Sequence, residues 1–116
     1  VNVVGSLISR MTGVGVYLHA GRENGVASTK AFLSQVTVLT LIATWFAQQK
    51  HKLFSNEVNP RIQEITNSLH CLSIYTGITL SSTRELCKEI AKKIYNKDHM
   101  FVLGKGFAEP IAYEGA

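Results

Sequence analysis

The stretch from Glu23 to Gln35, ENGVASTKAFLSQ, holds the side chains best placed to bind an oxygen-rich ligand. A flexible glycine, Gly25, precedes two hydroxyl residues and a lysine, and a long apolar run follows them. A helix that begins at Ser28 would leave backbone N–H groups unpaired at its N-terminus, where they attract oxygen atoms and anions. Serine at a helix start most often only caps the helix. The stretch therefore predicts either a plain cap or a binding site.

Other residues with reactive side chains predict little chemistry. Cys71 and Cys87 are the only cysteines, and no signal-peptide pattern precedes them, so we expect reduced thiols in a cytoplasmic protein. His70 lies next to Cys71, but no second pair with zinc-ligand spacing accompanies them. The turn Gly104–Gly106 has neither the dinucleotide-binding nor the P-loop spacing. We expect no metal site and no cofactor.

The net charge of +4 comes from the first half of the chain. Residues 1–55 contain five basic side chains and one acid, Glu23, but the basic residues are scattered and form no run. Later lysines, such as Lys88 and Lys92, alternate with Glu85 and Glu89, which is typical of a solvated helix face. We therefore expect no nucleic-acid partner.

A run without charges extends from Ala31 to Gln49 and approaches the length of a membrane span. Polar residues recur along one side of it, including Ser34, Thr37 and Thr44, so a buried or half-buried helix of a soluble domain is favoured over a membrane helix.

The elements that position these residues alternate between extended and helical patterns. Apolar, β-branched segments predict strands, and serine, asparagine and proline signals predict the helix starts. In order, we expect a strand at Val1–Val4, a helix from Ser6 to Met11, a strand at Val16–Ala20, a helix from Ser28 to about Gln49, a helix from Asn59-Pro60 to about Ser73, a helix from Ser82, a strand at His99–Leu103 and a final helix. This alternation predicts an α/β fold.

Three strings carry a family resemblance: VNVVGSLISR at the start, E-x-GVASTKAF-x-SQ after it, and FVLGKGFAEPIAYEGA at the end. Together they resemble the sugar isomerase (SIS) domains of the glutamine:fructose-6-phosphate aminotransferases. The resemblance implies a three-layer αβα fold with a parallel sheet, incomplete here and rich in helix. It also implies three parts: residues 1–50 from a first SIS subdomain, residues 51–82 as a connection with a helix, and residues 83–116 from a second subdomain.

The same resemblance implies a sugar-phosphate site that holds fructose 6-phosphate or glucosamine 6-phosphate. Val26, through its backbone, and Ser28 would bind the substrate, and Glu114 would have a supporting acid/base role. The family's phosphate-binding loop and its catalytic lysine and glutamate would lie outside this chain, which we expect to be inactive by itself. The complete enzyme is expected to be a homo-oligomer. The alternatives are another SIS isomerase or deaminase, or a SIS module that senses a sugar phosphate.

Overall fold

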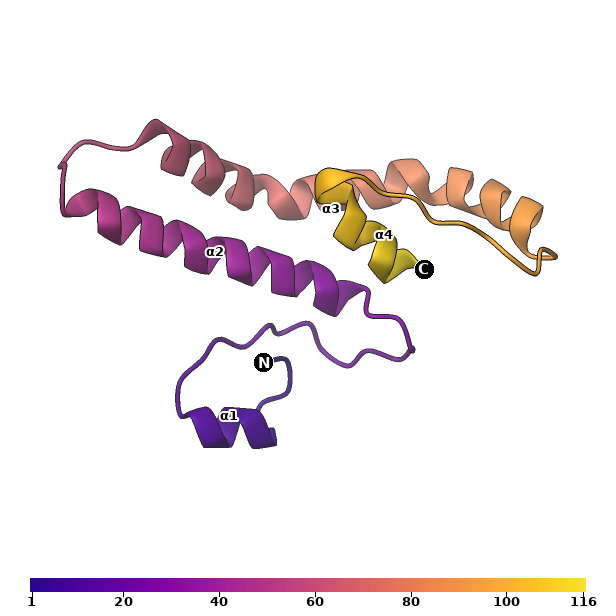
Figure 1. The fold of residues 1–116 in the computed structure, drawn as a ribbon, viewed down its shortest axis with the longest axis horizontal. Coiled ribbons are helices and arrows are strands. Elements are labelled where there is room, and N and C mark those ends of the chain that lie inside the picture. The colour runs from indigo at the N-terminus through magenta and orange to yellow at the C-terminus, as the bar shows by residue number, and fades with distance from the viewer. The chain divides into compact units, whose positions relative to one another are not determined.

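The computed structural model describes residues 1–116, and every regular element in it is a helix. The elements are α1 (Leu7–Thr12), α2 (Lys30–Lys52), α3 (Pro60–Ile94), the 3-10 helix η1 (Gly106–Ala108) and α4 (Glu109–Gly115) (Figure 1). No strand and no sheet is present. The predicted three-layer α/β fold is therefore wrong for this chain, which is all-helical.

The chain forms two compact units, Val1–Ile65 and Thr66–Ala116, and the division falls within α3. Neither unit has a hydrophobic core. Ala31 and Thr44 are the only buried residues, and both belong to α2 in the first unit. The predicted division at residues 50 and 82 concerns a larger protein and stays a prediction.

The two segments predicted as strands in the first unit make one step of parallel pairing. The backbone nitrogen of Val1 donates to the carbonyl of Val16 at 2.9 Å, and the nitrogen of Leu18 donates to the carbonyl of Val1 at 2.9 Å. One residue bonded to positions j−1 and j+1 of its neighbour is the pattern of a parallel ladder. The pairing stops after this residue, so neither segment becomes a strand.

A side chain replaces the backbone where the ladder would continue. The amide of Asn2 accepts from the Ala20 nitrogen at 3.0 Å and donates to the Gly21 carbonyl at 2.8 Å. His19 has a φ of 53°, in the left-handed region that extended chains do not use. The predicted strand Val16–Ala20 is therefore interrupted at His19.

Helix α1 forms as the sequence predicts. The Ser6 hydroxyl accepts from the Ser9 nitrogen at 3.4 Å and caps the helix. Gly13 ends it with a φ of 65°, which glycine adopts without the steric cost of a Cβ.

Helix α2 is long and mostly exposed. It begins at Lys30, two residues after the predicted start at Ser28, and extends to Lys52. Large apolar side chains on it remain exposed, such as Leu39 at 66% and Phe46 at 62%, so the prediction of a buried or half-buried helix is wrong within this chain. By length and composition, α2 is the one helix that could span a membrane. Core helices of soluble proteins can meet the same criterion.

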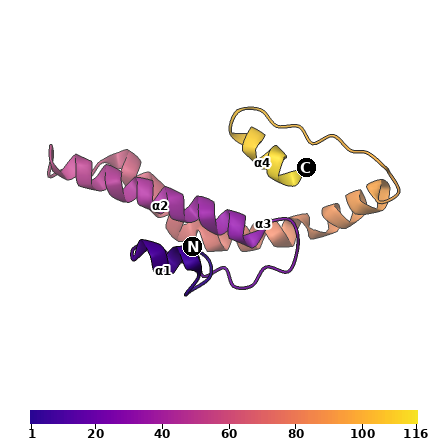
Figure 2. The same cartoon turned by 60° about the horizontal axis from the view of Figure 1, so that its bottom comes forward.

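Part of the apolar surface of α2 faces the first turns of α3. The chain reverses direction between the two helices, as Figures 1 and 2 both show. An open apolar hollow of about 550 Å³ lies between them, lined by Val36, Leu39, Thr40, Ala43, Thr44, Ala47, Ile62 and Ile65. No side chain of the first unit packs into this hollow, so the apolar surface that lines it stays open.

Helix α3 starts at the predicted residues but does not end where predicted. The Asn59 side chain accepts from the nitrogens of Arg61 at 3.0 Å and Ile62 at 3.3 Å, and Pro60 is the first helical residue. The helix then continues past Ser73 and through Gly77 to Ile94 without a break (Figure 2). The helix end predicted at about Ser73 is therefore wrong.

Hydroxyl groups inside α3 explain why the predicted second helix start is absent. Ser82 donates to the Thr79 carbonyl at 3.1 Å, so its side chain lies along the helix and does not act as a cap. Thr76, Thr79 and Ser81 donate in the same way to carbonyls four residues earlier. Such bonds pair the hydroxyl groups within a continuous helix. A capping rule applied to the sequence alone predicts a helix start at the same residues.

The last part of the chain forms a turn and a short helix. Residues 99–103, predicted as a strand, are irregular because no neighbouring strand is available to bond with them. The predicted final helix is confirmed as α4. A Cβ at Gly104 would clash with the Ala108 carbonyl and lie 2.8 Å from the Cβ of Ala112, so the turn requires glycine there.

The continuity of α3 can be tested at Gly77. The space around a Cβ at this position is empty, and alanine is favoured over glycine in a helix interior. We expect Gly77→Ala to slow amide exchange in the middle of α3 by about 1 kcal/mol of local stability, measured by hydrogen exchange. Gly104→Ala, which introduces a clash, should instead loosen α4. Unchanged exchange around residue 77 would contradict an unbroken helix.

Candidate functional site

The predicted binding stretch forms a loop that ends at the N-terminus of α2. Thr29 is the N-cap residue, and its side chain makes no capping hydrogen bond to the helix. Ser28 is half-buried and immediately precedes the cap. The prediction that Ser28 begins the helix is therefore wrong.

A carboxylate of the chain itself occupies this helix start. Oε1 of Glu23 accepts from the Thr29 backbone nitrogen at 2.6 Å and from the Thr29 hydroxyl at 2.8 Å. A negative charge is favourable here because the N-terminus of a helix carries a partial positive charge. The unpaired N–H groups that the sequence predicts are thus partly satisfied from within the chain.

The pKa of Glu23 reflects this arrangement. The hydrogen bond from the Thr29 backbone lowers it most, and the Thr29 hydroxyl adds to the effect. The Ala31 backbone and the positive charge of Lys30 lower the pKa further, since each favours the ionised carboxylate. Glu23 is therefore ionised throughout the neutral pH range.

The two predicted binding residues lie within the loop that Glu23 and Thr29 close. Val26 is at its tip and fully exposed, and Ser28 lies two residues further on. Lys30 adds a positive charge at the end of the loop. A Cβ at Gly21 would lie 3.9 Å from its Nζ. The loop thus combines an exposed backbone, a hydroxyl and an ammonium group.

Glu114 belongs to the second unit, where it lies on α4 and is exposed. A hollow of about 270 Å³ in that unit is lined by Val102, Leu103, Gly104, Glu109, Ala112, Tyr113 and Ala116, and Glu114 is not among its lining residues. Its acid/base role stays a prediction.

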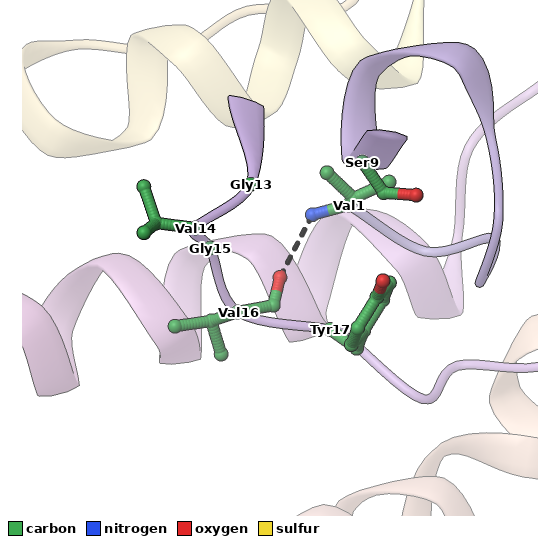
Figure 3. Close-up of a pocket in the computed structure, with 7 residues that line it drawn as sticks. All are labelled: Val1, Ser9, Gly13, Val14, Gly15, Val16 and Tyr17. Carbon is green, nitrogen blue, oxygen red and sulfur yellow. Dashed lines mark hydrogen bonds between the residues drawn. The ribbon is translucent and has the colours of Figure 1, made fainter. Parts of the chain in front are cut away.

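The first unit has a separate hollow of about 410 Å³ beside α1 (Figure 3). It is lined by Val1, Ser9 and the turn Gly13–Tyr17, and none of the predicted binding residues contributes to it. Figure 3 shows that the Val1 nitrogen and the Val16 carbonyl bond to each other across this hollow. No acidic, basic or thiol side chain lines this hollow, so it offers no cluster of such groups for catalysis.

Sequence reasoning missed the role of Glu23. The capping-box rule looks for a glutamate three residues after the cap, whereas Glu23 comes six residues before Thr29. Only the course of the intervening loop brings the carboxylate to the helix start. No group of three or more histidine, cysteine or acidic side chains that could hold a metal ion occurs in the structure.

Comparison with known proteins gives long matches to one kind of enzyme. A glutamine–fructose-6-phosphate aminotransferase (isomerizing) of Bacteroides thetaiotaomicron is 38% identical over 118 aligned residues, which cover 99% of this chain. The enzyme of the same name from Thermococcus kodakarensis is 34% identical over all of the chain. A probable glutamine–fructose-6-phosphate aminotransferase (isomerizing) of Schizosaccharomyces pombe is 35% identical, also over all of the chain.

The chain spans only a small share of these relatives. It covers 18% of the length of the Bacteroides and Thermococcus enzymes and 16% of the Schizosaccharomyces enzyme. No family model and no solved structure matches it.

Proposed function

Because the chain belongs over its whole length to one segment of the glutamine–fructose-6-phosphate aminotransferase family, we propose that it forms part of the isomerase region of such an enzyme. That enzyme forms glucosamine 6-phosphate from fructose 6-phosphate and glutamine, a step of hexosamine biosynthesis. The observation that carries the proposal is the alignment at 34–41% identity across nearly all of the chain. An alignment of this extent includes both the Glu23–Gln35 stretch and the C-terminal segment.

Within the isomerase region, the loop before α2 contributes to the sugar-phosphate site. The backbone of Val26 and the hydroxyl of Ser28 bind the substrate. The full exposure of Val26 supports this role, since the residue is open to a ligand. The carboxylate already present at the helix start makes this loop better suited to sugar hydroxyls than to a phosphate, because like charges repel.

Glu114 has a supporting acid/base role in the same reaction. An exposed carboxylate on a short helix can accept and return a proton during opening of the sugar ring, provided that the complete site brings the substrate within hydrogen-bond distance. The groups that move the proton between C1 and C2 come from other parts of the enzyme.

The exposed apolar side chains of α2 fit a chain that packs against further parts of a larger, water-soluble protein. Leucine, phenylalanine and tryptophan side chains of α2 lie in the open in this structure. Burial of each would contribute about 1.5–3 kcal/mol. We place the complete enzyme in the cytoplasm as a homo-oligomer, without a nucleic-acid or membrane partner and without a cofactor.

The function is tested with the product of the complete gene that encodes this chain. Incubated with fructose 6-phosphate and glutamine, it should form glucosamine 6-phosphate, measured by mass spectrometry. The 116-residue chain alone should form none. A folded complete product that leaves fructose 6-phosphate unchanged would contradict the proposal, and turnover by the isolated chain would contradict our assignment of the catalytic groups to other parts.

Ser28→Ala tests the binding role of the hydroxyl. Loss of one neutral hydrogen bond, about 1 kcal/mol, should raise the Kd for fructose 6-phosphate about fivefold in the complete protein. Isothermal titration calorimetry measures the change. Ser34→Ala, on helix α2 and outside the loop, is the matched control and should leave the Kd unchanged. Equal affinity of the Ser28 variant and the control would remove Ser28 from the site.

Glu114→Gln tests the acid/base role. The amide keeps the shape of the side chain but cannot exchange a proton, so kcat should fall about a hundredfold while KM changes little. Steady-state kinetics of the complete enzyme measure both constants. Glu109→Gln removes the same charge from the same helix and should leave kcat within about twofold. A Glu114 variant with normal kcat would exclude the role.

A further inference from the structure

We propose that Glu23 is a positioning residue of the sugar-binding loop. Its side chain bonds to Thr29 and so ties the beginning of the loop to the start of α2. This tie fixes the backbone of Val26 and the hydroxyl of Ser28. The inference rests on the proposed function of that loop. It adds a residue that does not itself touch the substrate.

The geometry of the tie supports this role. Both hydrogen bonds from Thr29 end on the same oxygen, Oε1 of Glu23, at 2.6 and 2.8 Å. They join two residues six positions apart and close a loop that contains Gly25, whose lack of a side chain leaves the backbone free to move. Without the tie, the entropy of the open loop would have to be lost when a ligand binds.

The electrostatics favour the same arrangement over other positions of the side chain. The ionised carboxylate lies at the positive end of α2, and Lys30 on that helix is the charged group that acts on it. The hydrogen bonds from Thr29 lower the pKa of Glu23 relative to an ordinary glutamate. Because the pKa is lowered in the folded state, the stabilisation that the negative charge adds to the tie is fully present above the ordinary glutamate pKa and is lost as the pH falls through the lowered value.

The choice of variants separates the hydrogen-bonded tie from the effect of charge. Both bonds end on Oε1, so the side-chain carbonyl of glutamine can accept both, and Glu23→Gln should keep the loop closed. Glu23→Ala removes the acceptor and opens the loop. Glu57→Ala removes a carboxylate from another loop of the same unit and is the matched control, since its side chain takes part in no ion pair of the structure.

The experiment measures two properties of each variant in the complete protein: the Kd for fructose 6-phosphate by calorimetry, and amide hydrogen exchange of residues 25–29 without ligand. We expect Glu23→Ala to raise the Kd about tenfold, the effect of losing a strong capping interaction, and to speed loop exchange by a similar factor. Glu23→Gln should remain within about threefold of the natural protein in both Kd and exchange rate. The control Glu57→Ala should match the natural protein. Circular dichroism should show that α2 persists in all variants.

The outcomes separate this inference from the proposed function. If the natural protein binds fructose 6-phosphate and Glu23→Ala binds it equally well, the positioning role is overturned while the function stands. If the natural protein binds no fructose 6-phosphate, the proposed function fails. Amide hydrogen exchange of residues 25–29 then tests the tie by itself. Faster exchange in Glu23→Ala that Glu23→Gln restores then still supports the tie, and equal exchange in all variants overturns it.

Discussion

Hydrogen bonds within single helices hold this structure together, because burial of side chains contributes little. Only Ala31 and Thr44 are buried, and no residue of the second unit is. In proteins most of the stability of a helix comes from the packing of its apolar face. Each exposed leucine or phenylalanine forgoes about 1.5–3 kcal/mol that a core would provide. The structure therefore depends on the local signals that start each helix: caps, a proline and a carboxylate.

Local signals are also what could be predicted from the sequence. The Ser6 cap of α1, the Asn59-Pro60 start of α3 and the last helix, α4, are confirmed, because each is decided by a few neighbouring residues. The start of α2 was predicted within two residues. The error there has a specific cause, since the capping group comes from Glu23, which is outside the window that capping rules use.

Strands could not be predicted in the same way, because a strand exists only when another strand lies beside it. The segment Val16–Ala20 has a suitable composition, and Val1 makes one step of parallel pairing with it. The ladder then gives way to the Asn2 side chain and to the left-handed backbone of His19. Residues 99–103 have no partner at all. The α/β fold is predicted from the alternation of extended and helical patterns and from the family resemblance, whereas strand pairing is a property of chain segments that must meet in space.

The binding loop lies between these two cases. Its residue types pointed to a helix start that attracts oxygen atoms, and the resemblance supplied the names of Val26 and Ser28. Neither could reveal that the helix start is occupied by a carboxylate of the chain itself, because this depends on the path of five intervening residues. The part of a site that residue types can predict is its chemistry. Residue types do not predict which polar groups of the chain already bond to the groups of that site.

The tight turn at Gly104 has a consequence for how this chain can change over evolutionary time. The backbone of Ala108 and the side chain of Ala112 approach so closely that even a methyl group has no room. Every single-nucleotide change that replaces this glycine adds at least a Cβ, so each would be removed by selection wherever the turn is needed. The turn therefore restricts this one position to glycine.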